Sequence, residues 1–176
     1  MGGNRILLVG PRACGKTTLA LYLAENKGYR AIDLDERFTE SVSQSIESYV
    51  AANGWPAFRA KEHEILASTL ANLDNQEDTV VSTGGGIVLS MENRRLLRKS
   101  GCVVYLAVPP DELVRRLVRD PKSSMRPKLS QATLEEEVRA TLASRETLYS
   151  LVANLKVDAT LPVSAMAEQI LTFLAG

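Results

Sequence analysis

Cysteine, surplus charge of either sign and long apolar runs are all scarce in this sequence. Its two cysteines, Cys14 and Cys102, lie far apart with no paired spacing, so a reduced, cytoplasmic protein fits best. The 21 basic side chains are balanced by 21 acidic ones, which gives no support for binding to nucleic acid or to a membrane surface. No apolar run approaches the roughly 20 residues that span a bilayer. An apolar strand already begins at Arg5, which leaves no room for a signal peptide.

The sequence also lacks repeats, low-complexity tracts and linkers. We therefore expect one domain over residues 1–176, which is long enough to bury a core. Short apolar runs alternate with amphipathic segments, and this alternation predicts an α/β fold with a parallel sheet covered on both faces. The five predicted strands are Arg5–Val9, Ala31–Leu34, Thr79–Ser82, Cys102–Val108 and Lys156–Ala159.

Several residues mark the ends of the predicted helices. Gly28, Gly54 and Gly101 stand where a left-handed C-terminal residue is expected. The sequence TLEE from Thr133 predicts a capping box that opens a helix running to about Ala153. Before it, the Pro-, Ser- and Lys-rich stretch Arg119–Ala132 is typical of a mobile surface loop.

The sequence GPRACGKT at residues 10–17 matches the phosphate-binding pattern GxxxxGK[ST]. It lies between a predicted strand and a predicted helix, which is the context that this pattern requires. Glycines let the backbone wrap closely around an anion, and the helix adds its positive N-terminal end. Lys16 would reach the β- and γ-phosphates, and the Thr17 hydroxyl would face Mg²⁺. We predict that ATP binds through Gly10, Pro11, Arg12, Ala13, Cys14, Gly15, Lys16, Thr17 and Thr18.

Three polar clusters could form the acceptor site. Asp33 and Asp35 lie at the end of the second strand, where alternation would point both carboxylates to one side. Arg59 and Glu62 are three residues apart in a helical segment that also carries Phe58. The sequence STGGG, residues 82–86, ends the third strand. All of these would meet the phosphate loop at the carboxyl edge of a parallel sheet.

Each cluster also has a purely structural interpretation. An aspartate at the end of a strand is often a helix cap. An Arg–Glu pair three residues apart commonly stabilises a helix surface, and three glycines could form only a turn. The single histidine, His63, and the basic stretch Arg94–Lys99 are expected on helix surfaces.

Taken together, GPRACGKT, DLD, FRAKE, STGGG, MRPKL and RETLY resemble a shikimate kinase over essentially the full chain. The six motifs occur in the order and at the spacing of that family. The resemblance implies a nucleoside-monophosphate-kinase type of P-loop fold in three α/β/α layers, with a five-stranded parallel sheet, a substrate-binding region at about 33–62 and a mobile lid at about 119–132. It also implies transfer of the γ-phosphate of ATP to the 3-hydroxyl of shikimate, in the pathway to the aromatic amino acids.

The resemblance assigns roles to individual residues. Arg59 and Arg145 would bind the shikimate carboxylate, which suits the planar fork of arginine. Asp35 would accept hydrogen bonds from ring hydroxyls and is the candidate base, although it could serve chiefly to orient the acceptor. Glu62 would orient Arg59. The other expected substrate contacts are Phe58, Gly84, Gly85 and Gly86, and the expected catalytic residues are Lys16, Asp35 and Arg126.

The third strand is not followed by the aspartate with which many P-loop proteins hold Mg²⁺. The nearest carboxylate is Asp33, which the resemblance also assigns to the metal together with Thr17, while Ser82 is a weaker candidate. Arg126 in the lid would close over the phosphates, and Arg119 would lie against adenine. The loop within Val157–Pro162 would lie on the adenine side.

Two rival functions remain at this point. A kinase for gluconate or a nucleoside monophosphate would use the same fold, and a nucleotide-dependent switch would need no acceptor site. The paired arginines favour a small carboxylated polyol over a nucleotide. Val50 stands where the family often has an aromatic residue, which would loosen the pocket. The small size and the lack of an obvious exposed apolar stripe favour a monomer.

Overall fold

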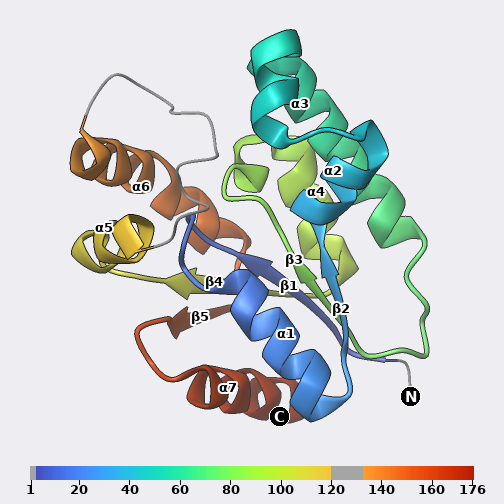
Figure 1. The fold of residues 1–176 in the computed structure, drawn as a ribbon. Coiled ribbons are helices and arrows are strands. Elements are labelled where there is room, and N and C mark those ends of the chain that lie inside the picture. The colour runs from blue at the N-terminus through green and yellow to red at the C-terminus, as the bar shows by residue number, and fades with distance from the viewer. Residues whose placement is uncertain (1–2, 120–132) are drawn as a thin grey trace.

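A computed structural model describes residues 3–119 and 133–176. Its five strands form one parallel sheet in the order β2-β3-β1-β4-β5 (Figure 1). The strands are β1 (Arg5–Val9), β2 (Arg30–Asp33), β3 (Thr79–Ser82), β4 (Cys102–Ala107) and β5 (Leu155–Asp158). The predicted α/β class and five-stranded parallel sheet are therefore confirmed.

Helices cover both faces of this sheet (Figure 1). Side chains on β1 alternate between two cores: Ile6 and Leu8 belong to one, and Leu7 and Val9 to the other. Because both faces are covered, β1 is a continuous apolar run rather than an alternating one. The helices are α1 (Lys16–Lys27), α2 (Leu34–Val42), α3 (Ile46–Ala71), α4 (Met91–Ser100), α5 (Pro110–Arg119), α6 (Leu134–Val152) and α7 (Val163–Ala175), with a 3₁₀ turn η1 at Ile87–Leu89.

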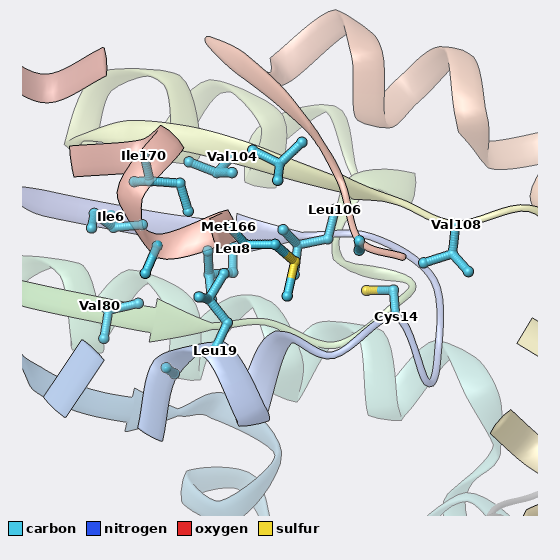
Figure 2. Packing of buried hydrophobic residues seen from close by; sticks show 14 of the residues in the cluster. Ile6, Leu8, Cys14, Leu19, Val80, Val104, Leu106, Val108, Met166 and Ile170 are labelled. Atoms are coloured by element: carbon cyan, nitrogen blue, oxygen red, sulfur yellow. The ribbon is translucent and has the colours of Figure 1, made fainter. Parts of the chain in front are cut away.

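The first core lies between the sheet and helices α1 and α7. Leu19 of α1, with Met166 and Ile170 of α7, packs against Ile6, Leu8 and their neighbours (Figure 2). The second core buries α3 and α4 against the opposite face. Helix α6 contributes Val138 and Leu142 to the first core and Tyr149 and Val152 to the second. Among the described helices, none combines the length and apolarity needed to cross a membrane.

The kink inside α3 determines how this helix presents its side chains. Gly54 has φ 80° and ψ 167°, which breaks the helix, and Pro56 follows in the first turn of the second half. Proline suits this position because its missing N–H would have no partner in the first turn of a helix. The second half then carries Phe58, Arg59 and Glu62 on regular helical spacing.

Helix ends agree with the sequence in most places. Thr133 and Glu136 form the predicted capping box of α6, and Gly28 ends α1 in the left-handed conformation at φ 75°. Gly101 is a correction, because its φ of 167° is extended rather than left-handed. Glycine is needed there for space: a Cβ would lie 2.5 Å from the Arg5 carbonyl oxygen.

We expect Gly101→Ala to lower the free energy of unfolding by about 1–3 kcal/mol, because the backbone of Arg5 must shift to admit the methyl group. Gly28→Asn is the matched control. A Cβ at Gly28 meets no atom within 4 Å, and asparagine tolerates the left-handed conformation. Urea denaturation of both variants measures the difference, and equal stability of Gly101→Ala and wild type would contradict the steric explanation.

Candidate active site

The phosphate loop follows β1 and is shaped by residues with positive φ. Gly10, Ala13 and Gly15 have φ of 149°, 60° and 101°. A Cβ at Gly10 would lie 2.9 Å from the carbonyl oxygen of Leu106, so the loop can pass β4 only as glycine. The Cys14 side chain is fully buried in the first core, so this residue can offer only backbone to a ligand (Figure 2).

Lys16 begins α1 and is 8% exposed. Its ammonium group donates to the carbonyl oxygens of Gly10 and Pro11, at 2.9 and 2.8 Å. These bonds compensate for the burial of the charge and hold it inside the loop. A cation enclosed by a glycine-rich loop at a helix N-terminus is the arrangement that binds a phosphate chain.

Asp33, at the end of β2, caps a helix and also binds the Thr17 hydroxyl. Its Oδ1 accepts from the backbone N–H of Asp35 at 2.9 Å and so caps α2. Its Oδ2 accepts from the Thr17 hydroxyl at 2.8 Å, and the Ser82 hydroxyl lies 3.5 Å from Thr17. The cap interpretation is therefore correct for Asp33, and the same carboxylate lies beside the hydroxyl that we predicted to face Mg²⁺.

Asp35 reaches the site by a route that the sequence pattern did not indicate. It lies in the first turn of α2 rather than on the strand. The expected strand alternation of Asp33 and Asp35 is therefore wrong, because capping by Asp33 starts the helix at Leu34 and the strand ends one residue earlier than predicted, at Asp33.

Asp35 lines a pocket with residues from α3, α6 and the glycine loop. The lining residues are Arg12, Asp35, Ile46, Trp55, Phe58, Arg59, Glu62, Gly84, Gly85, Gly86 and Arg145. All the residues predicted to bind the acceptor are in this set. Three guanidinium groups and two carboxylates line one small pocket, a balance that favours an anionic ligand carrying hydroxyl groups.

Arg59 is fixed from several directions. Its Nη1 donates to Glu62 Oε2 at 2.6 Å, as predicted from their spacing. Its guanidinium carbon lies 5.0 Å from the centre of the Phe58 ring and 5.4 Å from that of Trp55. Contacts of this kind orient a cation by ring electrostatics and packing. The fork is thus held in place before any ligand arrives.

Glu62 is buried, with 7% of its surface exposed. Burial raises the pKa of this carboxyl, although Arg59 beside it acts in the opposite direction; Asp35 raises it further and Arg145 lowers it. Its second oxygen, Oε1, has no hydrogen-bond partner among the described residues. A Cβ at Gly84 would lie 2.8 Å from this oxygen and 3.2 Å from Asp35 Oδ1, so only glycine lets the loop approach both carboxylates.

The glycine loop is anchored from α6. Arg145 Nη1 donates to the Gly85 carbonyl oxygen at 3.2 Å, and the Tyr149 hydroxyl donates to the same oxygen. A Cβ at Gly86 would overlap the Arg59 guanidinium. The loop therefore lies between the two arginines that were predicted to bind one carboxylate.

The acceptor pocket adjoins the phosphate loop. Arg12 and Arg145 also line a second cavity, which is bounded by Pro11 and by residues of α5 and α6. Arg12 of the phosphate loop thus also lines the acceptor pocket, which places the two predicted sites next to each other, as transfer between two bound ligands requires.

The two arginines predicted near ATP outside the phosphate loop are Arg119 and Arg126. Arg119 is the exposed last residue of α5 and does not line the pockets described here. Arg126 lies outside the described residues, as does all of the lid predicted at about 119–132 except Arg119, so the roles of Arg119, Arg126 and the lid stay predictions. His63 is not a plain surface residue, because its Nδ1 lies 2.6 Å from Oδ1 of the buried Asn93 on α4.

Sequence reasoning missed Trp55, Ile46 and Arg116. Trp55 and Ile46 line the acceptor pocket, and a tryptophan next to a Gly–Pro kink was the only available signal. Arg116 on α5 donates to the carbonyl oxygens of Ala13, Cys14 and Ala159, at 3.4, 3.3 and 2.7 Å. It connects the phosphate loop with the β5–α7 loop through backbone atoms, which leave no pattern in the sequence.

Comparisons with known proteins identify the family. The model of the shikimate kinase family matches residues 12–175. A relative from Oleidesulfovibrio alaskensis, named shikimate kinase, is 45% identical over 173 residues, which cover 98% of each chain. The chain belongs to the shikimate kinase family. Shikimate kinase 2 of Yersinia enterocolitica is 42% identical over 170 residues, covering 97% of this chain and 95% of that protein.

A solved member of the family has nearly the same fold. The shikimate kinase from Acinetobacter baumannii in complex with shikimate has a TM-score of 0.88 and 30% identity, covering 98% of this chain and 93% of that one. The predicted shikimate kinase family and fold are therefore confirmed.

We expect Glu62→Gln to be more stable than wild type at pH 8 and equal to it at low pH. The folded chain raises the pKa of Glu62, so the favourable contribution of the protonated form is present at low pH and is lost as the pH rises through the folded pKa. Glutamine carries no charge to desolvate at either pH. Urea denaturation at pH 4 and pH 8 measures the two differences.

The control for this prediction is Glu64→Gln. Glu64 pairs with Lys61 at the same i,i+3 spacing but is 66% exposed, so its removal should change stability little at both pH values. A Glu62→Gln protein no more stable than wild type at pH 8 would show that Arg59 fully compensates for the burial.

Proposed function

We propose that this member of the shikimate kinase family transfers the γ-phosphate of ATP to the 3-hydroxyl of shikimate through the residues described above. The observation that carries this proposal is the pocket in which Arg59, Arg145 and Asp35 surround a glycine loop next to the phosphate loop. Shikimate has one carboxylate and three ring hydroxyls, and this pocket supplies a complementary group for each kind.

Arg59 and Arg145 bind the carboxylate of shikimate. Their guanidinium groups lie on either side of the glycine loop, and both can form paired hydrogen bonds to carboxylate oxygens. Asp35 accepts a hydrogen bond from the attacking hydroxyl and aims it at the phosphate. Because phosphoryl transfer has a loose transition state, orienting the hydroxyl matters more than early removal of its proton.

Lys16 and the backbone N–H groups of the phosphate loop hold the phosphates of ATP. Thr17 and Asp33 fit Mg²⁺, because a hydroxyl and a carboxylate lie together and few protein ligands are needed when phosphates and water complete the shell. The ion, when bound, neutralises charge on the phosphates. On the family resemblance alone, Arg126 is proposed to add positive charge at the transferring phosphoryl group. The cytoplasmic location and the monomeric state of the protein also stay predictions.

The direct experiment is a coupled assay of ADP release with Mg-ATP and one acceptor at a time: shikimate, quinate, gluconate or a nucleoside monophosphate. We expect release only with shikimate, because the two arginines of the pocket suit a carboxylate rather than a nucleotide and the relatives are named shikimate kinases rather than kinases of another polyol acid. Turnover with gluconate or a nucleotide, and none with shikimate, would overturn the proposed acceptor.

We expect Asp35→Asn to retain ATP binding and to lose about 100-fold in kcat, because the amide no longer accepts the hydroxyl proton or orients it as strongly. Glu36→Gln is the control: it is the next residue in the same turn of α2, is exposed and does not line the pocket. Steady-state kinetics and ATP titration check both variants. A kcat near that of wild type would remove Asp35 from the mechanism.

We expect Asp33→Asn to raise the Mg²⁺ concentration for half-maximal activity by about tenfold. Asparagine is as good a helix cap as aspartate, so the melting temperature should stay within about 2 °C of wild type. An unchanged Mg²⁺ requirement with an intact fold would leave Asp33 as a cap only.

A further inference from the structure

Two side chains of α6 share one acceptor in the glycine loop. Arg145 and Tyr149 are one helical turn apart, and both donate to the carbonyl oxygen of Gly85. The carbonyl has two lone pairs, so these two donors use its full capacity. Tyr149 is 0% exposed, so bulk water does not compete for its hydroxyl. Only Arg145 has been assigned a role in the proposed function.

The Tyr149 side chain is held rigidly. Its ring stacks on Tyr105 with centroids 5.1 Å apart and an interplanar angle of 25°. Burial raises the pKa of Tyr149 far above its ordinary value, so the hydroxyl stays protonated and remains a donor. A rigid donor fixes the direction of the carbonyl that it binds, which a mobile side chain could not do.

The Gly84 and Gly86 carbonyls accept from the backbone N–H groups of Ile87 and Leu89, at 3.1 and 3.0 Å, whereas the Gly85 carbonyl between them is held by the two side chains of α6. Residues 84–86 carry no side chains, and glycine backbone is the most permissive. In a trans peptide the N–H of Gly86 points opposite to the carbonyl of Gly85. Fixing one therefore fixes the other, and Gly86 lines the acceptor pocket and lies against Arg59.

We propose that Tyr149 is a positioning residue of the acceptor site, which acts by holding the Gly85 carbonyl. Tyr149 holds residues 84–86 against Arg59 and takes one lone pair of the Gly85 carbonyl oxygen. A second N–H of Arg145 therefore does not bond to that oxygen, and the remaining N–H groups of Arg145 stay available to a carboxylate. The inference rests on the proposed function, because it takes the carboxylate of shikimate as the ligand of Arg145.

The test compares Tyr149→Phe with Tyr105→Phe. Each change removes one hydroxyl from the same ring stack, but Tyr105 lines a different cavity from the acceptor pocket. Binding is followed through the fluorescence of Trp55, the one tryptophan, which lines the pocket. Steady-state kinetics then give KM for shikimate and for ATP separately.

We expect Tyr149→Phe to raise the Kd and KM for shikimate by about fivefold or more, the effect of losing one well-placed hydrogen bond. KM for ATP should stay within about twofold in both variants, and Tyr105→Phe should match wild type for shikimate. A general loss of structure would change both KM values together. Equal shikimate affinity in Tyr149→Phe and wild type would overturn the inference.

A double-mutant cycle with Arg145→Lys tests the route of the effect. If Tyr149 acts through the shared carbonyl and Arg145, the loss of shikimate affinity caused by Tyr149→Phe should shrink by at least about half in the Arg145→Lys background. Fully additive effects would contradict the shared-acceptor explanation. Wild type that turns over no shikimate would instead reject the proposed function, so the two failures are distinguishable.

Discussion

Parallel pairing of the central strand determines where every part of this site lies. β1 pairs with β3 on one side and with β4 on the other, with Leu8 beside Ser82 and Val9 beside Tyr105. This register brings the ends of β1 and β3 to one edge of the sheet, and pairing of Asp33 with Ser82 adds the end of β2. Each strand end then continues into a polar segment: the phosphate loop, Asp33 with the start of α2, or the glycine loop. Side chains far apart in sequence meet because their strands end together.

A second constraint is the free energy that it costs to hold an arginine in a fixed orientation for a small anion. Arg59 is oriented by Glu62, and burial makes the charge of Glu62 unfavourable. One oxygen of that carboxylate has no partner among the described residues, which is rare for a buried polar atom. The arrangement is poor for stability, but it holds the Arg59 fork in one direction before the ligand binds. Strained or costly groups of this kind concentrate at functional sites, where selection acts on geometry rather than on stability.

Much of the fold and site could be predicted because the decisive residues repeat short local rules. The sheet follows from buried apolar runs, the phosphate loop from glycines and Lys16 before a helix, and the Arg59–Glu62 pair from helical spacing. Asp35 was predicted in the pocket for the wrong geometric reason, because a cap at Asp33 turned the expected strand into a helix. Gly101 was misjudged because close approach to Arg5 depends on tertiary packing. Arg116 escaped notice altogether, since it binds backbone carbonyls about a hundred residues away, and any residue type can supply a carbonyl.

The difference between local sequence rules and tertiary contacts also explains how α6 can influence the acceptor site without an obvious motif. Arg145 was recognised through the resemblance of RETLY to the family, whereas a buried tyrosine is ordinarily a core residue. Yet the rigid ring of Tyr149, stacked on Tyr105 of β4, connects the central sheet with a loop that has no side chains of its own. Glycine is required in that loop because the carboxylates and Arg59 lie too close for a Cβ. The freedom that glycine brings must then be restricted by hydrogen bonds: the backbone of η1 holds the Gly84 and Gly86 carbonyls, and a donor packed against the sheet holds the Gly85 carbonyl between them.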